Sequence, residues 1–148
     1  MRTKIANLTA LAQAFLIVGC AQAPEEISRD TQPFAQMAED ATVSLLGTEP
    51  FWSIEIEPAN GGYVARYSTP ENMEGDSFVV QRFAGNNGVG FNGELAGEAV
   101  QIALSPGACG DAMSDRTYPY AATLSLGSLD LRGCGYTSEE PFVGEPSP

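Results

Sequence analysis

Apolar and polar side chains alternate with a period of two residues in short runs across residues 43–136, and this pattern limits the fold class. Successive side chains of a β-strand point to opposite faces, so the alternation is typical of half-buried strands. Turn-forming strings such as Asn60-Gly61-Gly62 separate the runs at intervals of about eight to twelve residues. We therefore expect an all-β protein, a single small antiparallel barrel or sandwich of about seven to eight strands. The runs cover residues 52–56, 63–68, 77–83, 89–91, 100–104, 122–126 and 129–134.

Length and charge limit the number of domains and the class of partner. The 148 residues suffice for one domain of ordinary size. The formal net charge is −12, and it becomes −14 if Arg2 and Lys4 are removed with an N-terminal signal. Because so acidic a chain repels phosphate backbones, we expect no nucleic-acid partner.

The inventory of reactive side chains argues against an enzyme. The chain has no His, and its only Lys is Lys4. Ser-His-Asp and Cys-His chemistry, Schiff-base formation by a processed chain and the commonest zinc ligands are therefore excluded. A carboxylate-pair hydrolase needs two acids at a defined separation in a groove, whereas Glu55 and Glu57 share the polar face of one expected strand. We expect no enzymatic activity, no cofactor and no bound metal.

Residues 1–19 have the pattern of an export signal. Two positive residues precede a mostly apolar run over residues 5–18, which is too short to span a bilayer. The run ends at Ile17-Val18-Gly19-Cys20, a string that resembles the lipobox of bacterial lipoproteins, whose signal is cut before the cysteine and whose thiol receives a diacylglycerol. This resemblance implies a palmitate-bearing membrane anchor on Cys20, and Ala21 after it implies sorting to the outer membrane.

A second cleavage site follows the first. Ala21-Gln22-Ala23 matches an ordinary small-residue cleavage site, which would release a soluble periplasmic protein. Because the next residue is Pro24, which obstructs that cleavage, we favour lipidation at Cys20. The composition then divides the chain into a signal (1–19), a flexible acidic tether (20–42), a β domain (43–136) and a disordered tail (137–148).

Cys109 and Cys134 form an even pair once Cys20 is lipidated or removed. Exported proteins seldom keep free thiols, so we predict a disulfide between them. Separate buried thiols and a two-cysteine metal site are the less favoured alternatives.

Residues 105–119 interrupt the alternation and form the longest connection in the expected fold. Polar loops on a rigid β scaffold often carry function. Asp111, Ser114, Asp115 and Arg116 are therefore our candidate partner-binding residues, with Arg116 able to make a bidentate contact to a carboxylate. Asp111, Ser114 and Asp115 could instead hold Ca²⁺, although their spacing matches no known calcium loop. The structural alternative, which we favour, is that the two Asp residues cap turns and pair with Arg116.

Four sequence blocks resemble those of a family of small bacterial envelope lipoproteins that has no established activity. They are Gly47-Thr48-Glu49-Pro50-Phe51-Trp52, Tyr67-Ser68-Thr69-Pro70-Glu71-Asn72, the string from Cys109 to Pro119, and Leu131-Arg132-Gly133-Cys134. The resemblance covers about residues 44–136 and implies an envelope location and a disulfide. In outline the expected domain is also similar to membrane-bound inhibitors of c-type lysozyme and to META-type domains.

These observations lead to a lipid-anchored, non-enzymatic binding protein of the cell envelope. A lysozyme-like cell-wall hydrolase is the favoured partner, because many such enzymes are basic and would be attracted by an acidic surface. One alternative is a carrier of a small ligand or lipid inside the barrel, and another is a structural envelope lipoprotein. A carrier needs an internal cavity, whereas core packing is the favoured role of the aromatic residues Trp52, Tyr63 and Tyr67.

Overall fold

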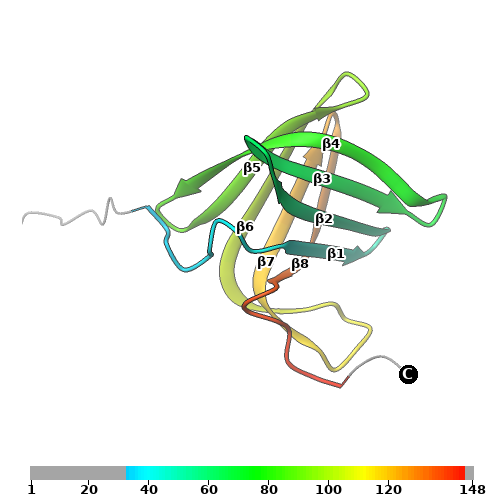
Figure 1. Ribbon diagram of the computed structural model, residues 1–148. Helices are drawn as coiled ribbons and strands as arrows, with labels where there is room; N and C mark the ends of the chain where they lie inside the picture. The colour runs from blue at the N-terminus through cyan, green and yellow to red at the C-terminus, as the bar shows by residue number, and fades with distance from the viewer. Residues whose placement is uncertain (1–32, 146–148) are drawn as a thin grey trace, which may run out of the picture.

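The computed structural model describes residues 33–145, so Cys20 and the predicted signal lie outside the described residues. Eight antiparallel strands pair in chain order, and the first pairs with the last to close a barrel (Figure 1). The predicted all-β class is confirmed, and of the two predicted architectures, barrel and sandwich, the structure is a barrel. The strands are β1 (Val43–Thr48), β2 (Phe51–Ala59), β3 (Gly62–Thr69), β4 (Asn72–Gly85), β5 (Gly88–Leu95), β6 (Glu98–Gly110), β7 (Thr117–Leu126) and β8 (Leu129–Thr137).

The alternation in the sequence fills the barrel interior with apolar side chains. In β2, for example, Trp52, Ile54 and Ile56 are buried, whereas Ser53 and Glu57 between and beyond them are exposed. Eight strands enclose a space that side chains can fill. The largest fully buried side chains include Leu45, Ile54, Ile56, Val80, Phe91, Ile102, Leu104 and Leu124. A ligand held inside the barrel would have to displace this core.

The aromatic residues mostly take the core-packing role. Trp52, Phe78 and Phe91 are buried, and Tyr63 and Tyr67 are partly buried against the same cluster. The ring centroids of Tyr63 and Phe91 lie 5.5 Å apart in an edge-to-face arrangement, the geometry that aromatic pairs prefer.

Residues 33–42 belong to the folded domain, which corrects the prediction that the flexible tether extends to residue 42. Phe34 and Met37 join the hydrophobic core. The Phe34 amide donates a hydrogen bond to Gly85 O at 2.8 Å, and the Arg82 guanidinium donates to Met37 O at 2.9 Å. The acidic composition concealed this packing because only two large apolar side chains carry it.

The segment 105–119 is mostly strand, which corrects the prediction of a long loop. Strand β6 continues to Gly110 and β7 begins at Thr117, so only residues 111–116 connect them. The register shifts between Pro106 and Cys109, where a bulge absorbs the residues that interrupt the alternation. Its residues, such as Pro106, are also typical of turns, so composition alone predicted a loop here.

The C-terminal strap, residues 138–145, lies across the end of the β6–β7 hairpin. Val143 exchanges two backbone hydrogen bonds with Thr117, at 2.8 and 2.9 Å. The Phe142 ring packs against Tyr118 and Tyr136, with centroid distances of 5.4 and 5.3 Å. The prediction of a disordered tail is therefore wrong for these residues, because Phe142 supplies an aromatic contact that their average composition does not reveal.

Candidate functional site

Three turns that are far apart in the sequence border one open groove of about 720 Å³, which we call the turn groove. Its walls come from residues 46–53 around the β1–β2 turn, 68–73 around the β3–β4 turn, and 111–118 at the tip of the β6–β7 hairpin. Figure 1 shows the three turns on the same side of the barrel. Leu46 and Ser53 lie between the buried, inward-facing residues of their strands, so part of the groove covers the outer face of the barrel.

Residues from the first three sequence blocks line the turn groove. Thr48 and Phe51 come from the first block, Thr69 and Pro70 from the second, and Met113 from the third. The fourth block, residues 131–134, lines a neighbouring cavity of about 550 Å³ together with parts of the first and third. All four blocks therefore lie around one region of the molecule.

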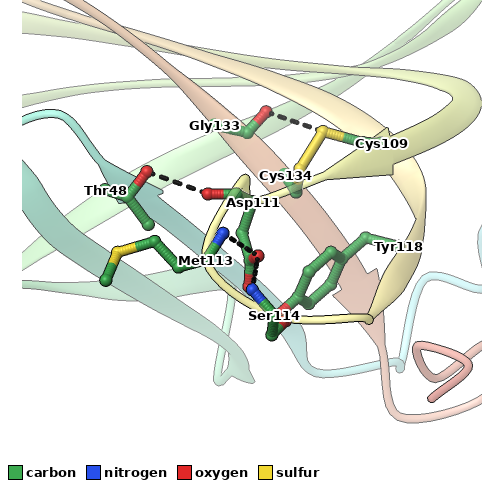
Figure 2. Close-up of a disulfide and its surroundings, with 8 residues drawn as sticks. All are labelled: Thr48, Cys109, Asp111, Met113, Ser114, Tyr118, Gly133 and Cys134. Carbon is green, nitrogen blue, oxygen red and sulfur yellow. Dashed lines mark hydrogen bonds between the residues drawn. A yellow bond between two sulfur atoms is a disulfide. The ribbon is translucent and has the colours of Figure 1, made fainter.

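Asp111 organises the hairpin tip as a turn cap. Its Oδ1 accepts hydrogen bonds from the amides of Met113 (3.0 Å) and Ser114 (2.8 Å). Its Oδ2 accepts from the Ser114 hydroxyl at 2.8 Å and the Tyr118 hydroxyl at 3.1 Å (Figure 2). These bonds, the Met113 amide foremost, lower the pKa of Asp111 to about 2. The carboxylate is thus engaged within the loop, as the turn-cap interpretation predicts.

Arg116 does not pair with Asp111 or Asp115, which corrects the predicted Arg–Asp network. Its guanidinium carbon lies 4.5 Å from the centroid of the Phe142 ring, and its Nε donates a hydrogen bond to Glu145 O at 3.1 Å. The strap offers both a ring face and a carbonyl, so the arginine turns toward the strap. Asp115 is exposed, and residues 33–145 offer it no ion-pair partner.

The hairpin tip is attached to the barrel at two points. The predicted disulfide is confirmed: Cys109 in β6 is bonded to Cys134 in β8, with their Cα atoms 5.6 Å apart (Figure 2). On the other side, the Thr48 hydroxyl donates to Asp111 O at 3.1 Å. The tip therefore presents its side chains from a fixed position rather than from a freely moving loop.

Sequence reasoning missed the exposed apolar side chains that border the groove. Phe51, Met73 and Met113 are 53%, 81% and 68% exposed. Phe51 is the first residue of β2, Met73 is the second residue of β4, and Met113 lies in the connection between β6 and β7. Figure 2 shows the Met113 side chain extending away from Tyr118 and the Asp111 carboxylate. A large apolar residue at or next to a turn-forming string, outside any alternating run, was the signal that could have identified them.

The two glutamates considered for a carboxylate-pair hydrolase, Glu55 and Glu57, do not line the turn groove. Glu55 forms an ion pair with Arg66, and Glu57 is exposed. Across residues 33–145, no cluster of three or more His, Cys, Asp or Glu residues is placed to hold a metal ion. The same part of the chain contains no helix long and apolar enough to cross a bilayer.

Comparisons with models of protein families, with curated proteins and with solved structures gave no match. The fold and the groove together define a small disulfide-bonded β-barrel, an architecture compatible with a binding protein.

Proposed function

We propose that this protein is a lipid-anchored, non-enzymatic envelope protein that binds a partner protein at the turn groove. The observation that carries the proposal is the convergence of three exposed apolar side chains, Phe51, Met73 and Met113, on one groove. Exposed apolar side chains gathered in this way mark interaction sites, and aromatic residues and methionine are enriched at protein interfaces.

The partner we propose is a basic lysozyme-type cell-wall hydrolase. The chain without residues 1–19 has a net charge of −14, so it attracts basic proteins over distances of about 10 Å at moderate salt. The outline resemblance to membrane-bound lysozyme inhibitors supports the same partner.

The attachment of the hairpin tip also supports a binding role. A disulfide and the Thr48–Asp111 hydrogen bond attach the backbone on the N-terminal side of Met113 to the barrel before any partner arrives. Preorganised contact residues lose less conformational entropy on binding, which favours affinity.

A lipid on Cys20 is compatible with an accessible groove. The N-terminal segment packs near Gly85, at the end of β4, and the Tyr63 hydroxyl near the start of β3 donates to Glu39 O at 2.8 Å. The turn groove lies at the other ends of these two strands, around Thr69 and Met73. The described N-terminal segment therefore meets the barrel at the end opposite the groove, so attachment on that side need not cover the groove.

The test is turnover of cell-wall substrate by c-type and g-type lysozymes with increasing amounts of the purified full chain. We expect dose-dependent inhibition that weakens as salt is raised. Met113→Ser should weaken inhibition, whereas Val79→Ser, at an exposed valine on β4 outside the groove, should not. Arg116→Ala tests the alternative in which the arginine enters the enzyme's cleft. Full turnover at micromolar protein would refute a lysozyme partner.

A further inference from the structure

We infer that the turn groove recognises a cationic amphipathic segment, a linear stretch of the partner in which large apolar side chains alternate with Lys or Arg. This inference rests on the proposed binding function and names the chemistry of the partner at the same site.

At or beside each turn around the groove lies an exposed apolar side chain and, within two residues of it in the sequence, an exposed carboxylate. Beside the β1–β2 turn the pair is Phe51, which begins β2, and Glu49. Beside the β3–β4 turn, Met73 near the start of β4 is flanked by Glu71 and Glu74. The β6–β7 tip repeats the pattern with Met113 and Asp115. None of these four carboxylates lines the groove itself, but each is the sequence neighbour of a residue that does, and we call Glu49, Glu71, Glu74 and Asp115 the rim.

The carboxylates of this rim are available to a partner. Within residues 33–145 the ion pairs are Arg66–Glu55 and Arg82–Glu39, neither of which involves the rim. The cation that lines the groove, Arg116, is engaged by Phe142 and Glu145 of the strap. Arg116 keeps its charge, but the four rim carboxylates and Asp111 outnumber it, so the net charge of the groove and its rim is negative and complements basic side chains.

The shape of the surface favours an extended ligand. A cavity of about 350 Å³ continues the turn groove across the outer faces of β1–β3, and the two share Leu46, Ser53, Ser68 and Met73. Leu46, Ser53 and Ser68 are register partners on successive strands, so they form a shallow row across the sheet. Flexible methionines beside such a row adapt to different apolar side chains.

The test uses three synthetic peptides of equal length. Their binding to the purified full chain is measured by fluorescence anisotropy. The first alternates lysine and leucine, the second lysine and serine, and the third glutamate and leucine. We expect tight binding of the first peptide alone, with an affinity that falls as salt rises. Equal binding of the lysine–serine peptide would overturn the inference, because charge alone would then account for it.

Matched variants locate the site. The double variant Met73→Ser, Met113→Ser should weaken binding about tenfold or more, and Val79→Ser should leave it unchanged. The double variant Glu71→Gln, Glu74→Gln should weaken binding and reduce its salt dependence. Its control is Glu57→Gln, Glu94→Gln, which removes the same charge from exposed positions that adjoin no groove-lining residue in the sequence. Equal losses in the groove variants and their controls would overturn the inference.

The proposed lysozyme partner and the inferred cationic amphipathic ligand can be refuted separately. Peptide binding at the groove without inhibition of any lysozyme would support the inference and refute the proposed partner. Lysozyme inhibition that is unaffected by the Met73→Ser, Met113→Ser variant would support the partner and overturn the inference.

Discussion

The indole of Trp52 lies directly over Gly47, where a Cβ would be 2.0 Å from the indole Nε1 and 2.8 Å from Arg132 O. The two residues are register partners across the β1–β2 hairpin. Trp52 is 3% exposed, so its ring cannot move into solvent without loss of core contacts. The first and last residues of the Gly47–Trp52 block thus depend on each other.

Replacing Gly47 by alanine should therefore destabilise the barrel by roughly 1–3 kcal/mol, the range for overpacking a core. Urea unfolding followed by the fluorescence of Trp52, the single tryptophan, measures this loss. The control is Gly62→Ala, where the nearest atom to the new Cβ would be 3.4 Å away. Its free energy of unfolding should stay within about 0.5 kcal/mol of wild type. Equal stability of the two variants would contradict the proposed packing.

Removing the disulfide should lower stability without changing the fold. The two cysteines are separated by 25 residues in the sequence, and the chain-entropy model gives roughly 3–4 kcal/mol for a loop of that size. The double variant Cys109→Ser, Cys134→Ser should show this loss in urea unfolding, and wild type with a reducing agent should match it. A loss in the variant but none on reduction would mean that the serines, and not the missing bond, destabilise the protein.

Asp111→Asn should lower stability in a pH-dependent way. The pKa of Asp111 falls from an ordinary 3.8 to about 2 in the folded state, since its ionised form accepts hydrogen bonds from Met113, Ser114 and Tyr118. Its stabilising effect is therefore fully present above about pH 4 and is lost as pH falls through about 2. The difference between variant and wild type should shrink over that window in unfolding measurements. Asp115→Asn, which removes an exposed carboxylate from the same connection, is the control variant.

Phe142→Ala should loosen the C-terminal strap. The ring contacts Tyr118, Tyr136 and Arg116, and loss of these half-buried contacts should reduce stability by about 1–2 kcal/mol. Amide exchange at Thr117, which donates to Val143 O at 2.8 Å, should accelerate. Val143→Ala is the control, because its side chain is 75% exposed and its backbone bonds remain. Unchanged exchange in Phe142→Ala would show that the ring does not hold the strap.

The proposed anchor is tested at Cys20. Cys20→Ser should abolish incorporation of a labelled fatty acid and move the protein out of the membrane fraction. Cys109→Ser serves as the control, since that cysteine lies in the disulfide and should not affect labelling. Membrane attachment that survives Cys20→Ser would refute the lipoprotein proposal.

Local patterns in the sequence predicted much of the fold. The alternation at Trp52, Ile54 and Ile56 identified a strand and its buried face, and the pair of cysteines that remains when Cys20 is set aside predicted the disulfide. Local composition gave wrong predictions where a few tertiary contacts order a segment whose average composition is typical of a flexible chain. Phe34 packs an acidic segment against the core, and Phe142 packs a proline-rich segment against Tyr118. Near Pro106, a bulge within a strand has the composition of a loop.

The sequence by itself determined the fold class, the buried faces of the strands and the pairing of Cys109 with Cys134, because periodicity and cysteine count are properties of the chain alone. The tertiary structure decided that Phe51, Met73 and Met113 share one groove and that Arg116 turns to the strap. These relationships depend on how a closed barrel brings distant turns together. Strand pairing sets that arrangement, and no pattern within a single turn encodes it.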